Sequence, residues 1–562
     1  MLARAHELPP EADERKVNDL LTAEHYPITV APGLTRLFQD YCEGNAAVQP
    51  FYASLPPAGG WPAAAGAAPP PEHWPELVQL LAAQNPSPAA APMLEALRNG
   101  AGVVVTGQQV GVFGGPLYTP LKAATALARA RQAAAAGRPH AAVFWLAGED
   151  HDFAEVNHVT FPARRELRKL VYSPASDTAA PLSARPVGSL VLEEAIVPLI
   201  DQAWELLGSS EAMDALAAAY KPGRTLAQAF AEFYAKIFAA QGLLVLDASS
   251  RAFHRMGAPV LRAAIERADE LHAALLDRNR ALAAAGYHAQ VAVTPLSSLL
   301  FLIDANTGAR LALKRIAPTA AEPNGLWQAG RQSYSAADLL AILDAEPERI
   351  SPSALLRPVF QDFLLSTSLI IGGPAEVAYF AQSAVLYERI LCRATPVLPR
   401  FSATLVEPAI AELLARHELT VERIFAENQD SLTQLLAARA MPPEAKRKIA
   451  ATGGALDAEL VPLLEWMQAQ DAGLGRSAQT SASKMRYQMN RLRRLAANFQ
   501  LQREASLGRH AQAICQAIYP GGTLQERVHG AAYYFARYGL GLAETLTVHA
   551  ANSCPGHTAL RL

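Results

Sequence analysis

The sequence predicts an α/β fold built around a doubly wound parallel sheet, and three features predict it. Two apolar runs, "GVVVT" at 102–106 and "AAVFWLAG" at 141–148, have the length and composition of buried strands. Residues 119–136 between them are helical in character, which makes a βαβ unit and therefore a parallel strand pair with a right-handed crossover. Residues 242–249 and 366–373 are further buried-strand candidates, each beside helical sequence.

The rest of this region predicts insertions into the sheet. Residues 286–316 alternate as antiparallel strands do, and 160–200 indicates a second inserted segment. We therefore expect a catalytic core over residues 1–400, interrupted by insertions at about 160–235 and 285–355. Residues 55–92 are rich in Pro, Ala and Gly, and we expect no regular structure there beyond a short helix.

An α-helical coiled-coil arm is predicted over residues 401–510, because apolar residues recur there at alternating four- and three-residue spacing. These residues are Leu456, Leu460, Leu463 and Met467, then Ala478, Ala482, Met485, Met489, Leu492, Ala496 and Phe499. The pattern fits either an antiparallel arm that also dimerises or a helix packed on its own domain. The segments "AMPPEAKRK" and "ATGG" are expected to break the helices, which favours the arm. Residues 511–562 are expected to pack back on the core.

Charge and cysteine content exclude several classes of protein. A net charge of -3 over 562 residues provides no sequence-independent attraction to nucleic acid. The N-terminus lacks an apolar signal core, and the long uncharged run 101–121 is too rich in Gly, Gln and Pro for a membrane helix. We expect a cytoplasmic protein that binds neither nucleic acid nor membrane. The four cysteines, which show no CxxC or zinc spacing and are expected to be reduced, are Cys42, Cys392, Cys515 and Cys554.

The first candidate site is the glycine-rich turn "TGQQVGVFGGPLYTPLKA", 106–123, between the first strand and the first helix. Such turns usually bind an anion, yet the glycine spacing matches neither the Walker A loop nor the dinucleotide-binding fingerprint. Gln108 and Gln109 either bind a polar ligand or satisfy the loop backbone. Tyr118 and Phe113 either form a wall of the site or belong to the core.

The helix after this turn is expected to begin at Thr119 as its N-cap, with Pro120 in the first helical position. This would place Lys122 in the first turn, where the positive end of the helix disfavours a cation by roughly 0.3–1 kcal/mol. Lys122 therefore either reaches towards an anionic ligand or faces solvent on an amphipathic helix.

The second candidate site is a row of four ionisable residues, Glu149–Asp152, directly after the second strand. The carboxyl ends of strands are where open α/β sheets bind ligands. His151 between carboxylates suits general acid–base chemistry without a metal, which is the interpretation we favour. Two others stay open. Asp152 and Glu155 fit a capping box that only starts a helix, and His151, Glu155 and His158 would share one helical face and suit a metal.

The third candidate site lies in "LLRPVFQDFLLSTSLIIGGPAEVAYFAQ", 355–382. A strand, the glycine pair Gly372–Gly373, a proline and a helix follow one another, as in the first turn. In a doubly wound sheet both turns would lie at one crevice. Arg357 near the sheet edge either binds a carboxylate or phosphate, or forms an internal ion pair with Asp362.

Together these elements resemble the bacillithiol-biosynthesis cysteine-adding enzyme family, BshC. The matching stretches are "GQQVGVFGGPLYTPLKA", "VFWLAGEDHDFAEVNHV", "LLRPVFQDFLL…IIGGPAEVAYFAQ" and "IYPGGTLQERV", and they span residues about 105 to 528 in the order of the family. The resemblance implies a Rossmann-like core related to class I aminoacyl-tRNA synthetases and nucleotidyltransferases. It also implies two connecting-peptide insertions and a coiled coil that mediates a homodimer.

The same resemblance implies a ligase that performs the last step of bacillithiol synthesis, in which L-cysteine is joined to the amine of glucosaminyl-malate. Because this condensation is uphill in water, the cysteine carboxyl needs activation, and the synthetase analogy suggests ATP. Lys122, Arg357 and the helix N-termini would hold the malate carboxylates. His151 with Asp150 would accept the amine proton. No covalent enzyme thiol and no metal are expected.

The sequence also departs from the synthetases. Their histidine signature is replaced by "GPLYTPLK", and Lys484 in "SASKMR" lies within the heptad stretch, where we expect a solvated coiled-coil residue. Two alternatives therefore stay open: a nucleotidyltransferase that forms an adenylate or a nucleotide-sugar, and a non-catalytic nucleotide-binding scaffold.

We predict four catalytic residues, Lys122, Asp150, His151 and Asp152, and no metal ligand. The predicted substrate- or nucleotide-binding residues are Gln108, Gln109, Gly111, Gly114, Gly115, Pro116, Tyr118, Glu149, Asn157, His158, Arg357, Gln361, Asp362, Gly372, Gly373, Glu376 and Tyr379.

Overall fold

The structure is a computed structural model that describes residues 22–54, 70–163, 166–174, 184–316, 326–552 and 555–562. Part of the Pro-rich segment, 55–69, and Cys554 lie outside these residues. The chain divides into two compact units: Met1–Thr404 with Gln525–Leu560, and Leu405–Leu524 with Arg561–Leu562. No helix in the described part of the chain is long and apolar enough to cross a membrane.

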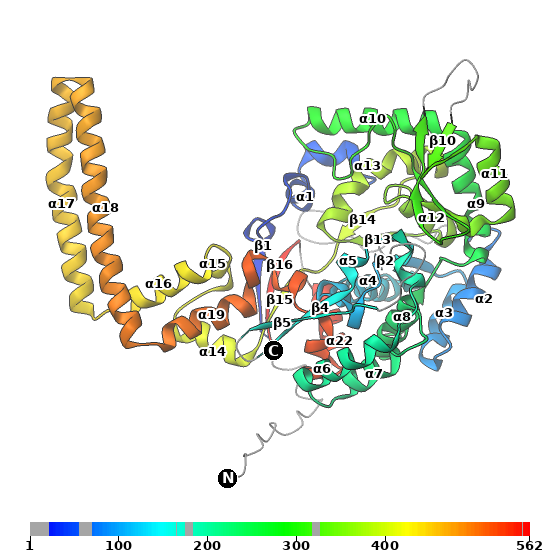
Figure 1. Cartoon of the computed structure of the whole chain (residues 1–562), viewed down its shortest axis with the longest axis horizontal. Helices are drawn as coiled ribbons and strands as arrows, with labels where there is room; N and C mark the ends of the chain where they lie inside the picture. Colours follow the sequence, from blue (N-terminus) through cyan, green and yellow to red (C-terminus); the bar gives the residue numbers. More distant parts are fainter. Residues whose placement is uncertain (1–21, 55–69, 164–165, 175–183, 317–325, 553–554) are drawn as a thin grey trace, which may run out of the picture. The chain divides into compact units, whose positions relative to one another are not determined.

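The first unit is built around a five-stranded sheet with the order β14-β13-β2-β3-β6 (Figure 1). Every neighbouring pair is parallel. This confirms the four predicted strands, whereas the short edge strand β14 was not predicted. The order reverses between β2 and β13, which makes this pair the switch point of a doubly wound sheet. The strands are β2 Gly102–Gln108, β3 His140–Leu146, β6 Leu244–Leu246, β13 Leu369–Gly372 and β14 Val397–Pro399.

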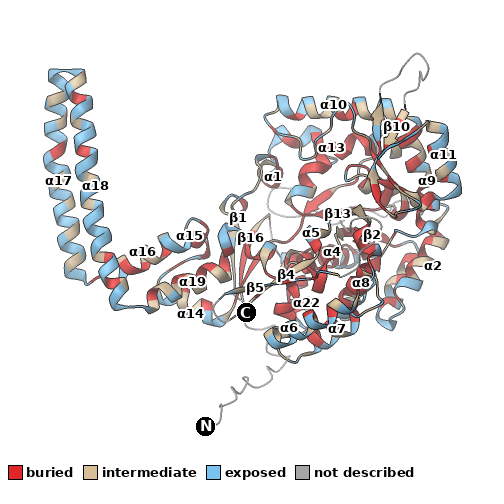
Figure 2. Ribbon diagram, in the orientation of Figure 1, coloured by how far each residue is buried: buried red, intermediate tan, exposed pale blue. Residues whose placement is uncertain are grey.

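Helices cover both faces of this sheet, as the doubly wound fold requires. On one face lie α4 (Tyr118–Ala135) and α8 (Leu226–Ile237), and on the other lie α2 (Trp74–Gln84), α3 (Ala91–Arg98) and α13 (Pro374–Leu391). All seven residues of β3 are buried, which explains its continuous apolar sequence (Figure 2). Against α4 packs α22 (Leu542–Asn552).

Helix α4 begins earlier than the capping pattern predicted, so the assignment of Thr119 as N-cap is wrong. The N-cap is Leu117, and the Thr119 side chain makes no capping hydrogen bond. Long-range pairing overrides the local preference here: Leu117 N donates to His529 O (2.8 Å), and Ala531 N donates to Gly115 O (2.9 Å). Lys122 consequently lies in the second turn of the helix.

The first insertion begins with an antiparallel hairpin and continues with helices. These elements are α5 Phe153–Val156, β4 His158–Pro162, β5 Leu167–Val171, α6 Val197–Leu207 and α7 Glu211–Ala219. Next come two helices that pack beside the core, α9 Arg251–Glu266 and α10 Ala268–Ala284.

The second insertion contains two small antiparallel sheets, as its alternating sequence predicted. Its strands begin only at Leu300, so the first part of 286–316 forms no strand. The elements are β7 Leu300–Ile303, β8 Arg310–Ala312, β9 Lys314–Ile316, β10 Leu326–Ala329, β11 Gln332–Tyr334, α11 Ala336–Ala345 and β12 Ile350–Pro352. Helix α12 (Arg357–Leu365) leads back to the main sheet.

Another sheet joins distant parts of the sequence, since β16 near the C-terminus pairs with β1 near the N-terminus. Its strands are β1 Ala23–Pro27, β15 Ala403–Val406 and β16 Gly556–Arg561. The remaining helices of the first unit are α1 Arg36–Cys42, α20 Gln525–Val528 and α21 Ala531–Tyr538.

The second unit is helical, and two long helices, α17 (Pro443–Gln470) and α18 (Ala472–Arg503), lie side by side as an antiparallel hairpin (Figure 1). Asp471 at the reversal caps α18 by accepting a hydrogen bond from Leu474 N (2.8 Å). The expected break at "ATGG" is wrong, because these residues lie inside α17. The other helices are α14 Pro408–Arg416, α15 Val421–Phe425, α16 Gln429–Ala440 and α19 Ser506–Ile518.

Candidate functional site

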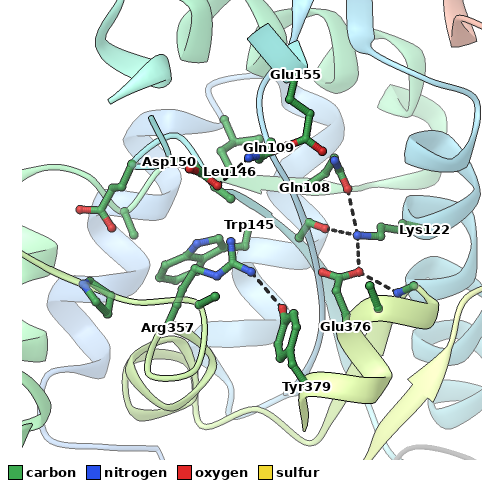
Figure 3. A pocket seen from close by; sticks show the side chains of 18 of the residues that line it. Gln108, Gln109, Lys122, Trp145, Leu146, Asp150, Glu155, Arg357, Glu376 and Tyr379 are labelled. Atoms are coloured by element: carbon green, nitrogen blue, oxygen red, sulfur yellow. Dashed lines mark hydrogen bonds and ion pairs between the residues drawn. The ribbon is translucent and has the colours of Figure 1, made fainter. Parts of the chain in front are cut away.

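A cavity of about 440 Å³ lies at the carboxyl ends of β2, β3 and β13, within the first unit. Much of its wall comes from residues at or after the ends of these strands (Figure 3). Phe301 and Arg310 of the second insertion also line it. Strand order reverses between β2 and β13, so the two loops diverge and leave a crevice. The cavity therefore occupies the position where doubly wound sheets bind their ligands.

The cavity brings together most of the predicted polar residues but few of the glycines. Lining it are Gln108, Gln109, Tyr118, Lys122, Glu149, Asp150, His151, Arg357, Gly373, Glu376 and Tyr379. Outside its lining are Gly111, Gly114, Gly115, Pro116, Asp152, Asn157, His158, Gln361, Asp362 and Gly372. Lining residues that the sequence did not indicate include Trp145, Phe301, Arg310, Arg400 and Arg527. The chemical roles of all these residues remain predictions.

The glycines in the middle of the first turn pack against aromatic residues instead of lining the cavity. The Tyr220 hydroxyl accepts a hydrogen bond from Gly114 N (2.9 Å) and donates to Gly111 O (2.7 Å), while the Tyr234 hydroxyl donates to Gly114 O (2.7 Å). Gly114 has a φ of +81°, and a Cβ there would lie 2.5 Å from the Phe233 ring. The Gly114 N–H is thus already occupied by a protein group and is not available to an anion.

Lys122 is neither solvent-facing nor left with a free N–H. Its ammonium donates to Gly107 O (2.8 Å) and to Gln108 Oε1 (2.9 Å), and it forms an ion pair with Glu376 (Figure 3). Three acceptors use the three protons of an ammonium group. Burial lowers the pKa of Lys122, and Glu376 partly offsets this. Glu376 also accepts from Gly373 N (2.7 Å) and so caps α13.

Glu149 at the end of β3 contacts a histidine that sequence analysis missed. Its Oε1 lies 2.8 Å from Nε2 of His254, a fully buried side chain on α9. Burial opposes the charged form of both groups, but their mutual attraction prevails, assisted by nearby arginines. The pKa of Glu149 is therefore lowered and that of His254 raised.

Asp150 is held as a carboxylate that orients its neighbours. It accepts hydrogen bonds from His151 N (2.7 Å) and Gln109 Nε2 (2.5 Å). Burial acts to raise its pKa, yet these hydrogen bonds and the charges of Arg310 and Arg357 leave that pKa lowered. The backbone here is fixed from the first insertion, because Val187 N donates to Asp150 O (2.6 Å).

His151 faces Arg310, and this contact determines its tautomer. Arg310 Nη1 lies 3.3 Å from Nδ1 of His151 and donates to it, since a guanidinium cannot accept. The neutral ring must then carry its proton on Nε2. Asp150 Oδ1 lies 3.6 Å from Nδ1, too far for a hydrogen bond. Nδ1 can accept a substrate proton only when its contact with Arg310 Nη1 is broken.

Arg310 itself is firmly positioned. Its Nε and Nη2 donate to Ser351 Oγ and Pro352 O (both 2.9 Å), and its guanidinium stacks 3.7 Å from the Phe301 ring centre. These partners are all uncharged. Arg310 has no carboxylate ion-pair partner among the described residues.

The residues after His151 support the capping alternative. Asp152 Oδ1 accepts a hydrogen bond from Glu155 N (3.1 Å) and caps α5. His158 begins β4, so residues 151–158 are not one helix and the proposed metal-binding face does not form. In the described ranges no group of three or more His, Cys, Asp or Glu side chains could hold a metal. Glu155 lines the cavity, and burial with the adjacent carboxylates raises its pKa.

Arg357 points into the cavity beside Trp145 and donates to the Tyr379 hydroxyl (3.0 Å; Figure 3). The alternative of an Arg357–Asp362 ion pair is wrong, because Asp362 pairs with Arg393 (2.6 Å). Burial raises the pKa of Asp362 to about 6. Like Arg310, Arg357 forms no ion pair with a carboxylate in the described part of the chain.

Comparison with known proteins identifies the family. Residues 21–401 match "Bacillithiol biosynthesis BshC, N-terminal Rossmann-like domain", and residues 403–562 match "Bacillithiol biosynthesis BshC, C-terminal coiled-coil domain". A protein of Koribacter versatilis named "Putative cysteine ligase BshC" is 42% identical over 95% of this chain and 99% of its own length. A protein of the same name from Solibacter usitatus is 35% identical over 94% and 98%. The chain belongs to the bacillithiol biosynthesis BshC family.

Proposed function

We propose that this protein is a ligase that joins the carboxyl group of L-cysteine to the amine of glucosaminyl-malate, the last step of bacillithiol synthesis. The names of its relatives support a cysteine ligase. One observation in the cavity supports the choice of the second substrate: Arg310 and Arg357 both lie there, and neither has a carboxylate ion pair among the described residues. Two such guanidinium groups suit a dicarboxylate, and malate supplies two carboxylates.

The amide bond forms when the amine nitrogen attacks the carbonyl carbon of the activated cysteine. The C–N bond forms, the amine proton moves to a base, and the activating group leaves with its electron pair. We assign the base to Nδ1 of His151. A substrate carboxylate that binds Arg310 would compete for Nη1 and release this nitrogen. Binding of the dicarboxylate thus prepares the base that deprotonates the amine.

ATP is our proposed source of activation, because the uncatalysed condensation is uphill. The glycines of the first turn do not fit its phosphates, since the Gly114 N–H donates to Tyr220, and Gly111, Gly114 and Gly115 do not line the cavity. Gly373 N, at the start of α13, is likewise occupied by Glu376. The proposed attack of the amine and the proton transfer to His151 involve no contact with the nucleotide.

We also propose a homodimer formed through the coiled-coil domain. Met485, Leu492 and Phe499 follow one another at seven-residue spacing on α18 and are 49%, 57% and 58% exposed. Residues seven apart share one face of a helix. Leu463 and Trp466 on α17 are similarly exposed. Most of the surface of α17 and α18 is exposed (Figure 2). A continuous apolar stripe on a helix hairpin is suited to pairing with a second copy.

The test is to incubate the purified protein with cysteine and glucosaminyl-malate, with and without ATP, and to identify the products by mass spectrometry. We expect the condensation product, formed only when ATP is present, together with AMP or ADP. Pyrophosphate without the amide would instead indicate a nucleotidyltransferase. Absence of turnover despite nucleotide binding would indicate a scaffold. Either result would contradict the proposal.

A further inference from the structure

Only one of the two carboxylate oxygens of Glu149 has a partner among the described residues. Oε1 contacts His254, whereas Oε2 has no hydrogen-bond or ion-pair partner among the described residues. The side chain is 17% exposed and lines the cavity. An unpaired carboxylate oxygen that lines a cavity is available to a cation that enters the cavity.

The contacts of His254 fix the protons of this pair. Its Nδ1 lies 3.0 Å from Ile350 O, and a carbonyl oxygen only accepts, so Nδ1 carries a proton. Nε2 lies 2.8 Å from Glu149 Oε1, where two facing lone pairs would repel, so a second proton lies between them. The pair is therefore either imidazolium with carboxylate or imidazole with carboxylic acid.

The surrounding charges select the ionised form. The charges of Arg310 and Arg357, which line the same cavity, favour the Glu149 carboxylate. Asp247, just after β6, attracts the imidazolium of His254 and repels the carboxylate of Glu149. The fully buried ring of His254 packs with its centre 5.5 Å from that of the Phe360 ring, and its contact with Ile350 O sets its orientation. Glu149 is thus fixed as an anion at the rim of the cavity.

The short strand β12 contacts both His254, which holds Glu149, and Arg310. In β12, Ile350 O accepts from His254, while Ser351 Oγ and Pro352 O accept from Arg310. The three consecutive residues are all buried. The strand therefore sets the cationic Arg310 and the anionic Glu149 in fixed positions on one wall.

We propose that His254 is a positioning residue and that the Glu149 it holds binds a primary ammonium group of a substrate. The inference rests on the proposed function, in which two groups qualify: the α-ammonium of cysteine, and the amine of glucosaminyl-malate in its protonated form. Glu149 would discriminate amino acids from thiol acids that lack the ammonium, while the arginines hold carboxylates.

The test uses isothermal titration of the whole protein and needs no turnover. One arm compares cysteine with 3-mercaptopropionate, which lacks only the ammonium group, and the other compares glucosaminyl-malate with its N-acetyl derivative. Each pair is titrated into the unsubstituted protein, Glu149→Gln and His254→Gln. The matched control is His140→Gln, because His140 is also buried and bonded to a carbonyl (Arg138 O, 2.8 Å) but lies at the opposite end of β3.

We expect the unsubstituted protein and the control to prefer the ammonium-bearing ligand of one arm by about tenfold to a hundredfold. Glu149→Gln should abolish this preference and His254→Gln should reduce it, with the affected arm identifying the ammonium group. A preference that survives Glu149→Gln in both arms would overturn the inference, and so would its persistence at full size in His254→Gln. Should His254→Gln fail to fold, Glu149→Gln alone decides. If the unsubstituted protein binds neither cysteine nor glucosaminyl-malate, the proposed function itself fails.

Discussion

Lys122 and Arg357 line the same cavity, but their charged groups differ in how many of their N–H donors are already used. The Lys122 ammonium donates hydrogen bonds to Gly107 and Gln108 and forms an ion pair with Glu376. These contacts connect the first turn with the start of α13. Arg357 has a single neutral partner, the Tyr379 hydroxyl. A buried cation with all its donors used stabilises the fold, whereas one with unused donors can bind a ligand.

Replacing Lys122 with methionine should therefore cost stability more than binding. It leaves Glu376 and the Gln108 oxygen in a buried place without a cation, and breaking such a pair costs about 3–5 kcal/mol. Chemical denaturation should show this loss, and Lys122→Met/Glu376→Met should recover part of it.

Lys236→Met is the control for Lys122, because its ion pair with Glu211 is about half exposed and worth about 1 kcal/mol or less. Equal free energies of unfolding for Lys122→Met and Lys236→Met would show that Lys122 has no structural role. That result would return Lys122 to the group of anion-binding candidates.

Among individual site residues, the sequence indicated those that directly follow buried strands. It did not indicate those that other segments of the chain contribute. Glu149–His151 were found because ionisable residues directly after an apolar run are unusual. Arg310 lies in "ARLALKR" and His254 in "RAFHRMG", which are ordinary strand and helix sequences. Their roles depend on packing against β12, and no local pattern encodes that contact.

Among the elements, the C-terminal strand β16 has a polar side chain buried at its start. His557 is 1% exposed, with Nδ1 2.8 Å from Ser402 Oγ and Nε2 2.8 Å from Thr404 Oγ1. Burial lowers its pKa from 6.5 to about 4. The strand thus depends on an imidazole that must remain neutral.

This predicts a pH dependence of stability. Between pH 6.5 and about 4 the unfolded chain binds a proton at His557 that the folded chain does not, so the free energy of unfolding falls as the pH is lowered through this range. The loss should reach about 3 kcal/mol at pH 4. Urea denaturation from pH 4 to 8 of the protein and of His557→Gln measures it. Identical slopes below pH 6.5 would contradict the assignment.

Element types were predictable where the hydrophobic period was clear, and boundaries failed where distant segments intervened. The strands at β2, β3, β6 and β13 followed from their apolar runs. The start of α4 did not, because Leu117 pairs with His529. The glycines of "ATGG" remain in α17, since a helix tolerates them at a cost of about 1 kcal/mol each when its neighbours favour helix.

At the scale of the whole molecule, the exposed stripe on α18 indicates a second copy of the chain. We predict that the protein is a dimer by analytical ultracentrifugation and that Leu492→Glu/Phe499→Glu is a monomer with unchanged helix content. Gln488→Glu/Asn490→Glu is the control, because it adds the same charge at exposed polar positions of the same helix. A monomeric parent protein, or a dimer that survives both apolar substitutions, would contradict this.

The central claim is that the cavity at the ends of β2, β3 and β13 forms the amide bond. Its most direct test is a mass-spectrometric assay with isotopically labelled cysteine, glucosaminyl-malate and ATP, run on the protein and on Arg357→Gln. The account predicts a labelled product equal to the two substrates less one water from the protein, and a rate at least about tenfold lower from Arg357→Gln. No such product from the unsubstituted protein, or equal rates from both, would contradict it.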